Sequence, residues 1–196
     1  MSLLEQWKQA FVELLKSPII TFKDGSISKL EYRNEYGELR RNPEIGPACI
    51  KYYENGNIYH ESYWVDGKIH RLDDPAHVGY YKNGNICYKE YWVNGKKHRL
   101  EGPASIDYYE NGNICYKEYW VNGKKHRLNN PAYIDYYKNG NIHYEQYYVN
   151  GEIHRLRGPA YIEYYENGKI RCEEYWVNGK KYGLGSPAYI EYYEKW

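Results

Sequence analysis

Residues 103–130 read PASIDYYENGNICYKEYWVNGKKHRLNN, and this stretch decides the fold. A closely similar 28-residue unit recurs without interruption from residue 47 to residue 186. Proline followed by alanine marks the start of every copy, at positions 47, 75, 103, 131, 159 and 187. A fixed period of this length is typical of a stacked repeat architecture, in which each unit contacts chiefly its neighbours. We therefore expect function to lie in a surface of equivalent residues and not in a pocket.

The repeats organise the 196-residue chain into four parts. These are an amphipathic capping helix over residues 1–18, a degenerate first repeat over 19–46, five full repeats over 47–186 and a partial terminal repeat over 187–196. The helix is predicted because Ser2 and Glu5 form a capping box ahead of apolar residues at helical spacing. We interpret its apolar face as a cover for the first repeat, with partner binding as the alternative.

Two turn signals fall in each unit, such as Asn111-Gly112 and Asn122-Gly123. Asn-Gly between β-prone runs indicates a hairpin, because both central residues of a type I′ turn need a positive φ. The intervals between turns predict strands over residues 114–121, 124–128 and 132–137. A bend is expected at Pro131, because proline removes a donor from the strand ladder. The pattern predicts an all-β protein, a long antiparallel meander.

Neighbouring strand residues point to opposite faces of a sheet, so paired tyrosines place one aromatic row on each side. Ala104, Ile106 and Tyr108 share one face and form the predicted core set. The opposite row consists of Tyr53, Tyr81, Tyr109, Tyr137 and Tyr165. That row is either a second core layer or an exposed aromatic strip that binds a protein partner.

At residues 118–126, EYWVNGKKH, and 136–140, YYKNG, the unit resembles the MORN repeat in its bacterial and giant-virus variant forms. The likeness covers residues 47–196 and, weakly, 19–46. It departs from the usual MORN unit at residues 126–132, where extra residues replace a His-Gly-x-Gly pattern. The resemblance implies an elongated, twisted sheet of stacked MORN-like repeats that serves as a scaffold for protein contacts. It also implies two alternatives, namely membrane or phosphoinositide binding and an antitoxin-like neutralising role.

Composition narrows the classes of function. The net charge is only +1, from 27 basic and 26 acidic residues, so we expect no nucleic-acid partner. No apolar run approaches the ~18 residues of a membrane span, and the N-terminus lacks the pattern of a secretory signal. The four cysteines show no ligand spacing and are expected to be free thiols in a reducing compartment. A cytoplasmic protein is the resulting expectation.

Chemistry-bearing residues recur in every unit, whereas an enzyme needs one asymmetric site. A His-Arg pair, such as His126-Arg127, repeats down the chain, and equivalent columns roughly 10 Å apart cannot share one zinc ion. We therefore predict a non-enzymatic protein with no catalytic residues, no metal site and no cofactor. A basic stripe able to meet anionic lipid is the competing surface, with candidate residues Lys96, Lys97, Arg99, Lys124, Lys125 and Arg127.

The last strand predicted, residues 188–193, has no following hairpin partner. Sheet edges with unpaired backbone groups recruit another chain unless they are guarded. The expected state is therefore either a monomer with Trp196 folded over the last repeat or an edge-to-edge homodimer.

Overall fold

A computed structural model describes residues 17–183 and 187–193 of the chain. The predicted helix over residues 1–18 lies outside the described residues, except for its last two positions. The predicted Trp196 cap also lies outside them. The chain divides into two compact units, Met1–Lys96 and Lys97–Trp196. The secondary structure assigned to the described residues consists of strands joined by turns, bends and loops, as the sequence predicts.

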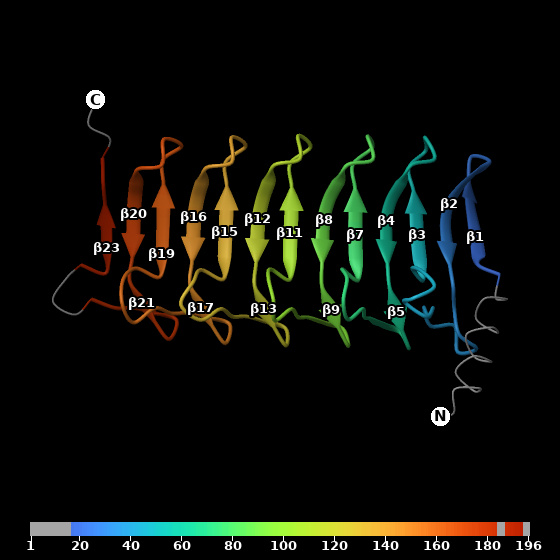
Figure 1. The fold of residues 1–196 in the computed structure, drawn as a ribbon, viewed down its shortest axis with the longest axis horizontal. Coiled ribbons are helices and arrows are strands. Elements are labelled where there is room, and N and C mark those ends of the chain that lie inside the picture. Colours follow the sequence, from blue (N-terminus) through green and yellow to red (C-terminus); the bar gives the residue numbers. More distant parts are fainter. Residues whose placement is uncertain (1–16, 184–186, 194–196) are drawn as a thin grey trace. The chain divides into compact units, whose positions relative to one another are not determined.

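Long strands run antiparallel to their neighbours within each unit (Figure 1). The first unit contains β1 (Ile19–Lys23), β2 (Ser26–Glu31), β3 (Cys49–Tyr52), β4 (Ile58–Ser62), β7 (His77–Tyr80) and β8 (Ile86–Glu90), paired in that order. The second contains β11 (Ser105–Tyr108), β12 (Ile114–Glu118), β15 (Tyr133–Tyr136), β16 (Ile142–Gln146), β19 (Tyr161–Tyr164), β20 (Ile170–Glu174) and β23 (Tyr189–Glu191), again in that order. The predicted antiparallel meander is confirmed in both units.

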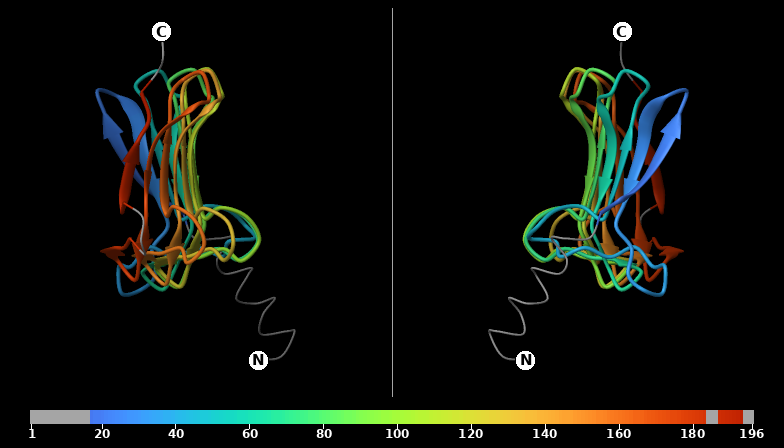
Figure 2. Two further views of the ribbon diagram at one scale, coloured as in Figure 1. Left: turned by 90° about the vertical axis from the view of Figure 1, so that its left-hand side faces the viewer. Right: turned by 90° about the vertical axis from the view of Figure 1, so that its right-hand side faces the viewer.

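Short two-residue strands lie beyond one end of the long strands (Figure 2). They are β5 (Trp64–Val65), β6 (Lys68–Ile69), β9 (Trp92–Val93), β10 (Lys96–Lys97), β13 (Trp120–Val121), β14 (Lys124–Lys125), β17 (Tyr148–Val149), β18 (Glu152–Ile153), β21 (Trp176–Val177) and β22 (Lys180–Lys181). The single strand predicted over residues 114–121 is therefore wrong. It breaks at Tyr119, whose N–H donates to the Ala132 carbonyl and whose carbonyl accepts from the His126 N–H, so the chain changes partners there.

The two turn series differ in conformation. In the second series both central residues have positive φ, as at Asn122 (51°) and Gly123 (79°), which confirms the type I′ prediction. In the first series only the glycine does, as at Gly56 (84°), so the type I′ prediction is wrong there. The Gly56 N–H donates to the Tyr53 carbonyl, and the Asn55 side chain accepts from the Asn57 N–H. These bonds describe a type I turn that ends in a left-handed glycine.

The core face predicted at Ala104, Ile106 and Tyr108 is confirmed for the alanine, whereas Ile106 and Tyr108 are half-buried. Ala104 is fully buried, as are its counterparts Ala76, Ala132 and Ala160, and Val78, Ile134 and Ile162 are at most 8% exposed. On the same face the Tyr80 hydroxyl donates to Glu61 at 2.7 Å. A bulge in each hairpin, as between Asp107 and Tyr108, shifts the register before the turn. Because of this shift, the tyrosine that follows, Tyr109, and one residue of the facing strand lie on the side of the sheet opposite the core.

The last strand, β23, pairs with β20 and ends the strand order of the second unit. Tyr189 is 43% exposed there. The position agrees with the predicted edge, and the edge-to-edge homodimer stays a prediction.

Candidate functional site

The face opposite the alanines carries four tyrosines that stack on one another in the second unit. Strand register aligns Tyr116 and Tyr144 with Asp135, and Tyr133 with Glu118 and Gln146. Ring centroids lie 5.7 Å apart for Tyr116–Tyr133, 5.3 Å for Tyr133–Tyr144 and 5.8 Å for Tyr144–Tyr161. All four side chains are half-buried. We call this surface, from Tyr116 to Tyr161, the aromatic face.

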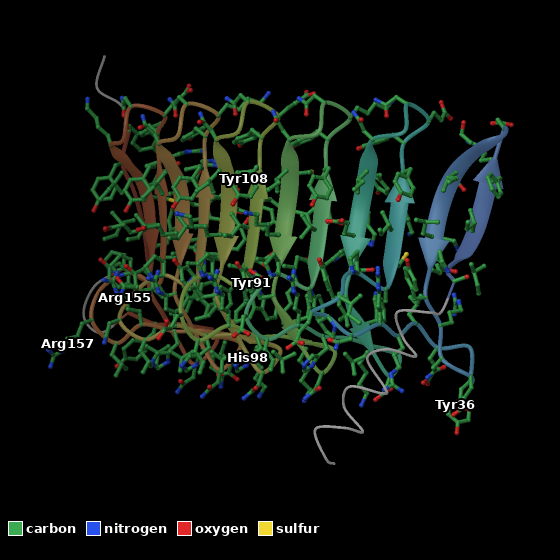
Figure 3. All side chains as sticks on the ribbon, turned by 45° about the vertical axis from the view of Figure 1, so that its right-hand side comes forward. Tyr36, Tyr91, His98, Tyr108, Arg155 and Arg157 are labelled. Atoms are coloured by element: carbon green, nitrogen blue, oxygen red, sulfur yellow. The ribbon has the colours of Figure 1, made fainter. Side chains whose placement is uncertain are left out.

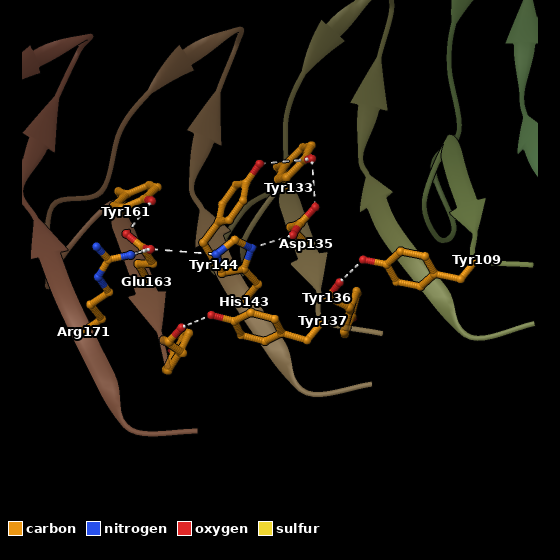
Figure 4. Close-up of polar contacts among 11 residues, drawn as sticks. Tyr109, Tyr133, Asp135, Tyr136, Tyr137, His143, Tyr144, Tyr161, Glu163 and Arg171 are labelled. Carbon is orange, nitrogen blue, oxygen red and sulfur yellow. Dashed lines mark hydrogen bonds and ion pairs between the residues drawn. The ribbon is translucent and has the colours of Figure 1, made fainter. Parts of the chain in front are cut away.

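A hydrogen bond between two hydroxyl groups joins the central pair of rings, Tyr133 and Tyr144 (Figure 4). The Tyr144 hydroxyl donates to the Tyr133 hydroxyl at 3.3 Å, and the Tyr133 hydroxyl lies 3.5 Å from Asp135 Oδ2. Burial and the bond to Tyr144 raise the pKa of Tyr133 far above its usual range. These contacts fix the orientations of the Tyr133 and Tyr144 rings.

A charged cluster lies beside the stack. His143 Nδ1 is 3.0 Å from Asp135 Oδ1, and His143 Nε2 is 3.8 Å from Glu163 Oε1. Arg171 donates to the same Glu163 oxygen at 2.6 Å (Figure 4). The carboxylates of Asp135 and Glu163 therefore each have a cationic or polar neighbour. These neighbours lower the free-energy cost of partly burying the carboxylates beside aromatic rings.

The predicted basic stripe splits into two rows. The inner lysines contact carboxylates and rings: Lys125 Nζ is 2.9 Å from Glu118 Oε1 and 4.6 Å from the Tyr133 ring centroid, and Lys97 Nζ is 3.7 Å from Glu118 Oε2. The outer lysines, Lys96 and Lys124, are exposed at the hairpin turns. The inner row therefore belongs to the aromatic face, and the outer row is open to solvent.

The predicted tyrosine row links neighbouring repeats. The hydroxyls of Tyr53, Tyr109, Tyr137 and Tyr165 donate to the carbonyls of Tyr80, Tyr136, Tyr164 and Tyr192 at 2.7–2.9 Å. Tyr81, the remaining member, is half-buried and its N–H donates to the Asn85 carbonyl. The row is half-buried and joins neighbouring repeats through hydrogen bonds. Its burial is intermediate between that of a second core layer and that of an exposed aromatic strip, the two roles considered from the sequence.

The predicted arginines hold the corner loops. Arg127 lies 3.8 Å from the Tyr119 ring centroid and donates from Nη1 to the Pro131 carbonyl at 3.2 Å. Arg99 makes the same bond to the Pro103 carbonyl at 3.2 Å. In the second unit Figure 3 places Arg155, of the same column, at the end of the strands opposite Tyr108. These guanidinium groups are engaged within the fold.

The histidine column is a second link between repeats. The N–H of Asn122 donates to His98 Nδ1, and that of Asn150 to His126 Nδ1, both at 3.1 Å. Each of these two histidines thus accepts a hydrogen bond from the turn of the next repeat. Among the described residues no group of three or more His, Cys, Asp or Glu side chains gathers as metal ligands.

Two features escaped the sequence reasoning. One is a row of exposed leucines in the corner loops: Leu72 (70%), Leu100 (77%), Leu128 (64%) and Leu156 (77%). The 28-residue period places them in one column, a signal that could have found them. The other is a histidine cluster in the first unit, formed by His60 and His77 with Tyr88 and Glu90. The sequence signal for this cluster is that His60 and His77 stand in columns that hold other residue types in the remaining repeats.

All four cysteines are free thiols, as predicted. Burial and a contact with Glu163 raise the pKa of Cys172 to about 11. At pH 8 we therefore expect native Cys172 to react with iodoacetamide more than about a hundredfold slower than in urea-unfolded protein. Peptide mass spectrometry over a time course measures this, and equal rates in both states would contradict it.

Within the described part of the chain, no helical segment has the length and apolar content required to cross a bilayer.

Comparison with known families bears on the repeats directly. A model described as the MORN repeat variant matches residues 48–66, 105–122, 132–150 and 160–178. Each match contains a long hairpin and the start of the short hairpin that follows it, so the matched period is the structural repeat. No curated protein sequence matches the chain.

Proposed function

Because this chain belongs to the MORN-repeat family, whose repeats are interaction scaffolds, we propose that it is a non-enzymatic scaffold that binds a protein partner through the aromatic face. The observation that carries the proposal is the four-ring stack from Tyr116 to Tyr161. Tyrosine offers a large contact area and a polar atom at low cost in side-chain entropy, which is why interfaces are enriched in it.

Preorganisation supports the same function. Tyr133 and Tyr144 are bonded to each other, and Lys125 lies over Tyr133 while it pairs with Glu118. A partner that docks here meets rings whose rotamers are already fixed, so less entropy is lost on binding. The surrounding carboxylates and lysines form a polar rim of the kind that borders protein interfaces.

The test compares a double variant, Tyr116→Glu with Tyr144→Glu, with the wild-type chain in quantitative capture from native lysate. We expect a specific protein to be retained by the wild type and lost by the variant, and purified partner to bind the variant at least about tenfold more weakly. Tyr36→Glu is the matched control, because Tyr36 is 81% exposed and lies outside the aromatic face (Figure 3). Thermal unfolding by circular dichroism establishes that each variant is folded.

A partner that binds the wild type and the double variant equally would contradict the proposal, as would the absence of any retained protein.

A second candidate, association with anionic membranes, is favoured by a separate observation. In the second unit the corner loop that carries exposed Leu128 follows directly on β14, the short strand that carries exposed Lys124. Exposed apolar side chains near basic groups suit a headgroup surface. Glu152 interrupts the outer lysine row, which weakens this candidate.

Sedimentation with vesicles containing anionic lipid separates the two functions. Membrane association predicts salt-sensitive pelleting that is lost on Lys96→Glu with Lys124→Glu and kept on Lys82→Glu with Lys138→Glu, a matched pair of exposed lysines at the opposite turns. The aromatic-face function predicts no pelleting in any of these proteins.

A further inference from the structure

Three polar atoms meet in a triangle on the first unit. His60 Nδ1 lies 2.9 Å from His77 Nε2 and 3.2 Å from the Tyr88 hydroxyl, and that hydroxyl is 3.0 Å from His77 Nε2. The two imidazole rings meet edge to face with centroids 4.4 Å apart. Strands β4, β7 and β8 each supply one of the three residues.

The triangle depends on departures from the repeat. Where His60 stands, the later repeats have Tyr88, Tyr116, Tyr144 and Cys172. Where His77 stands, the other repeats have Cys49, Ser105, Tyr133, Tyr161 and Tyr189. Within residues 17–183 and 187–193, two histidines thus occur in adjacent strands only here, in columns that the other repeats fill differently.

A third departure makes room for the tyrosine. Gly79 occupies a column that otherwise holds Lys51, Asp107, Asp135, Glu163 and Glu191. A Cβ atom at Gly79 would lie 2.7 Å from Tyr88 Cδ1 and closer still to Cε1, so any side chain would displace the ring. The Tyr88 ring lies directly over the glycine, and this position brings its hydroxyl to the two histidines.

We propose that His60, His77 and Tyr88 form a binding site for a divalent transition-metal ion of the zinc type, with Glu90 as the positioning residue behind His77. Zinc binds imidazole nitrogen at about 2.0–2.1 Å, so two ligands at a tetrahedral angle lie about 3.3 Å apart. The three donor atoms need to separate by only a few tenths of an ångström, roughly, to admit the ion.

Glu90 supplies the outer contact that histidine ligands commonly have. Its Oε2 lies 2.7 Å from His77 Nδ1, and the Trp92 indole donates to the same oxygen at 3.0 Å. A carboxylate that accepts from Nδ1–H leaves the Nε2 lone pair of His77 directed at the triangle. Without a metal that single lone pair faces two donors, the His60 imidazole and the Tyr88 hydroxyl, whereas a cation accepts electron pairs from all three groups.

All three ligand side chains are half-buried and not sealed from solvent, so water can supply the remaining ligand. Imidazole suits zinc, copper and nickel, and affinity rises along the series toward copper. The site is independent of the proposed partner-binding function, because it lies in the other unit.

Isothermal titration of the full chain with Zn²⁺ tests the proposal, and Co²⁺ absorption in the visible range reports the ligand geometry. We expect one ion per chain, with loss of binding in His60→Ala and in His77→Ala and a roughly 10- to 100-fold weaker affinity in Glu90→Gln. Gly79→Ala should also abolish binding, because its Cβ atom displaces the Tyr88 ring and adds no ligand.

His126→Asn is the control, because it removes a histidine that accepts a backbone bond outside the triangle and leaves an acceptor in its place. Unchanged Zn²⁺ affinity in the His60 and His77 variants, verified as folded by circular dichroism, would overturn the proposal. Equal loss in His126→Asn would also overturn it, because binding would then be a general property of the histidines.

Discussion

Replacement of Arg127 by methionine is expected to lower the free energy of unfolding by about 2–4 kcal/mol. The guanidinium lies 3.8 Å from the Tyr119 ring centroid and donates to the Pro131 carbonyl at 3.2 Å. Methionine keeps the length of the side chain but removes both interactions. The corner loop loses the group that holds it to the sheet, and a part-buried carbonyl loses its donor.

Urea unfolding monitored by circular dichroism measures the change. Arg127→Lys should have an intermediate effect, because lysine retains the charge but not the planar donor geometry. Lys124→Met is the matched control, since Lys124 is exposed at the adjacent turn, and its effect should stay within about 0.5 kcal/mol. Equal stabilities for Arg127→Met and Lys124→Met would show that the arginine does not hold the corner.

Alkaline pH is expected to unfold the protein in one cooperative step between about pH 10 and 12. Burial and hydrogen bonds to carboxylates raise the pKa of Tyr80 and Tyr164, and burial with a bond to Cys115 raises the pKa of Tyr109 to about 12. Unfolded tyrosine titrates near 10. The folded pKa is therefore the higher one, so these groups contribute their full stabilisation below pH 10 and lose it as the pH rises through the folded values.

Phenolate absorbance near 295 nm and circular dichroism should change together in this range. Protein unfolded in urea provides the reference, in which the tyrosines titrate independently near pH 10. Phenolate formation at pH 10 in a protein that keeps its sheet would contradict the expectation, because it would place the hydroxyls in water.

The candidate site was only partly predictable. Repetition identifies the columns that recur in every unit, and alternation separates the row that contains Tyr109 from the face that carries Tyr108. The role of that row was not deducible, because it depends on where the hydroxyl reaches. The Tyr109 hydroxyl donates to the Tyr136 carbonyl, one repeat away in sequence and next to it in space. Similarly, the arginines and inner lysines proposed as lipid ligands contact groups within the fold.

The sequence by itself determined the period, the antiparallel meander and the alanine core, because Asn-Gly turns, proline spacing and alternation are local properties of the chain. Tertiary structure decided the break at Tyr119, the bulges before each turn and the stack from Tyr116 to Tyr161. It also decided that His60, His77 and Tyr88 meet. These features depend on register between strands that lie a repeat apart, and a shift of one residue moves every side chain to the other face.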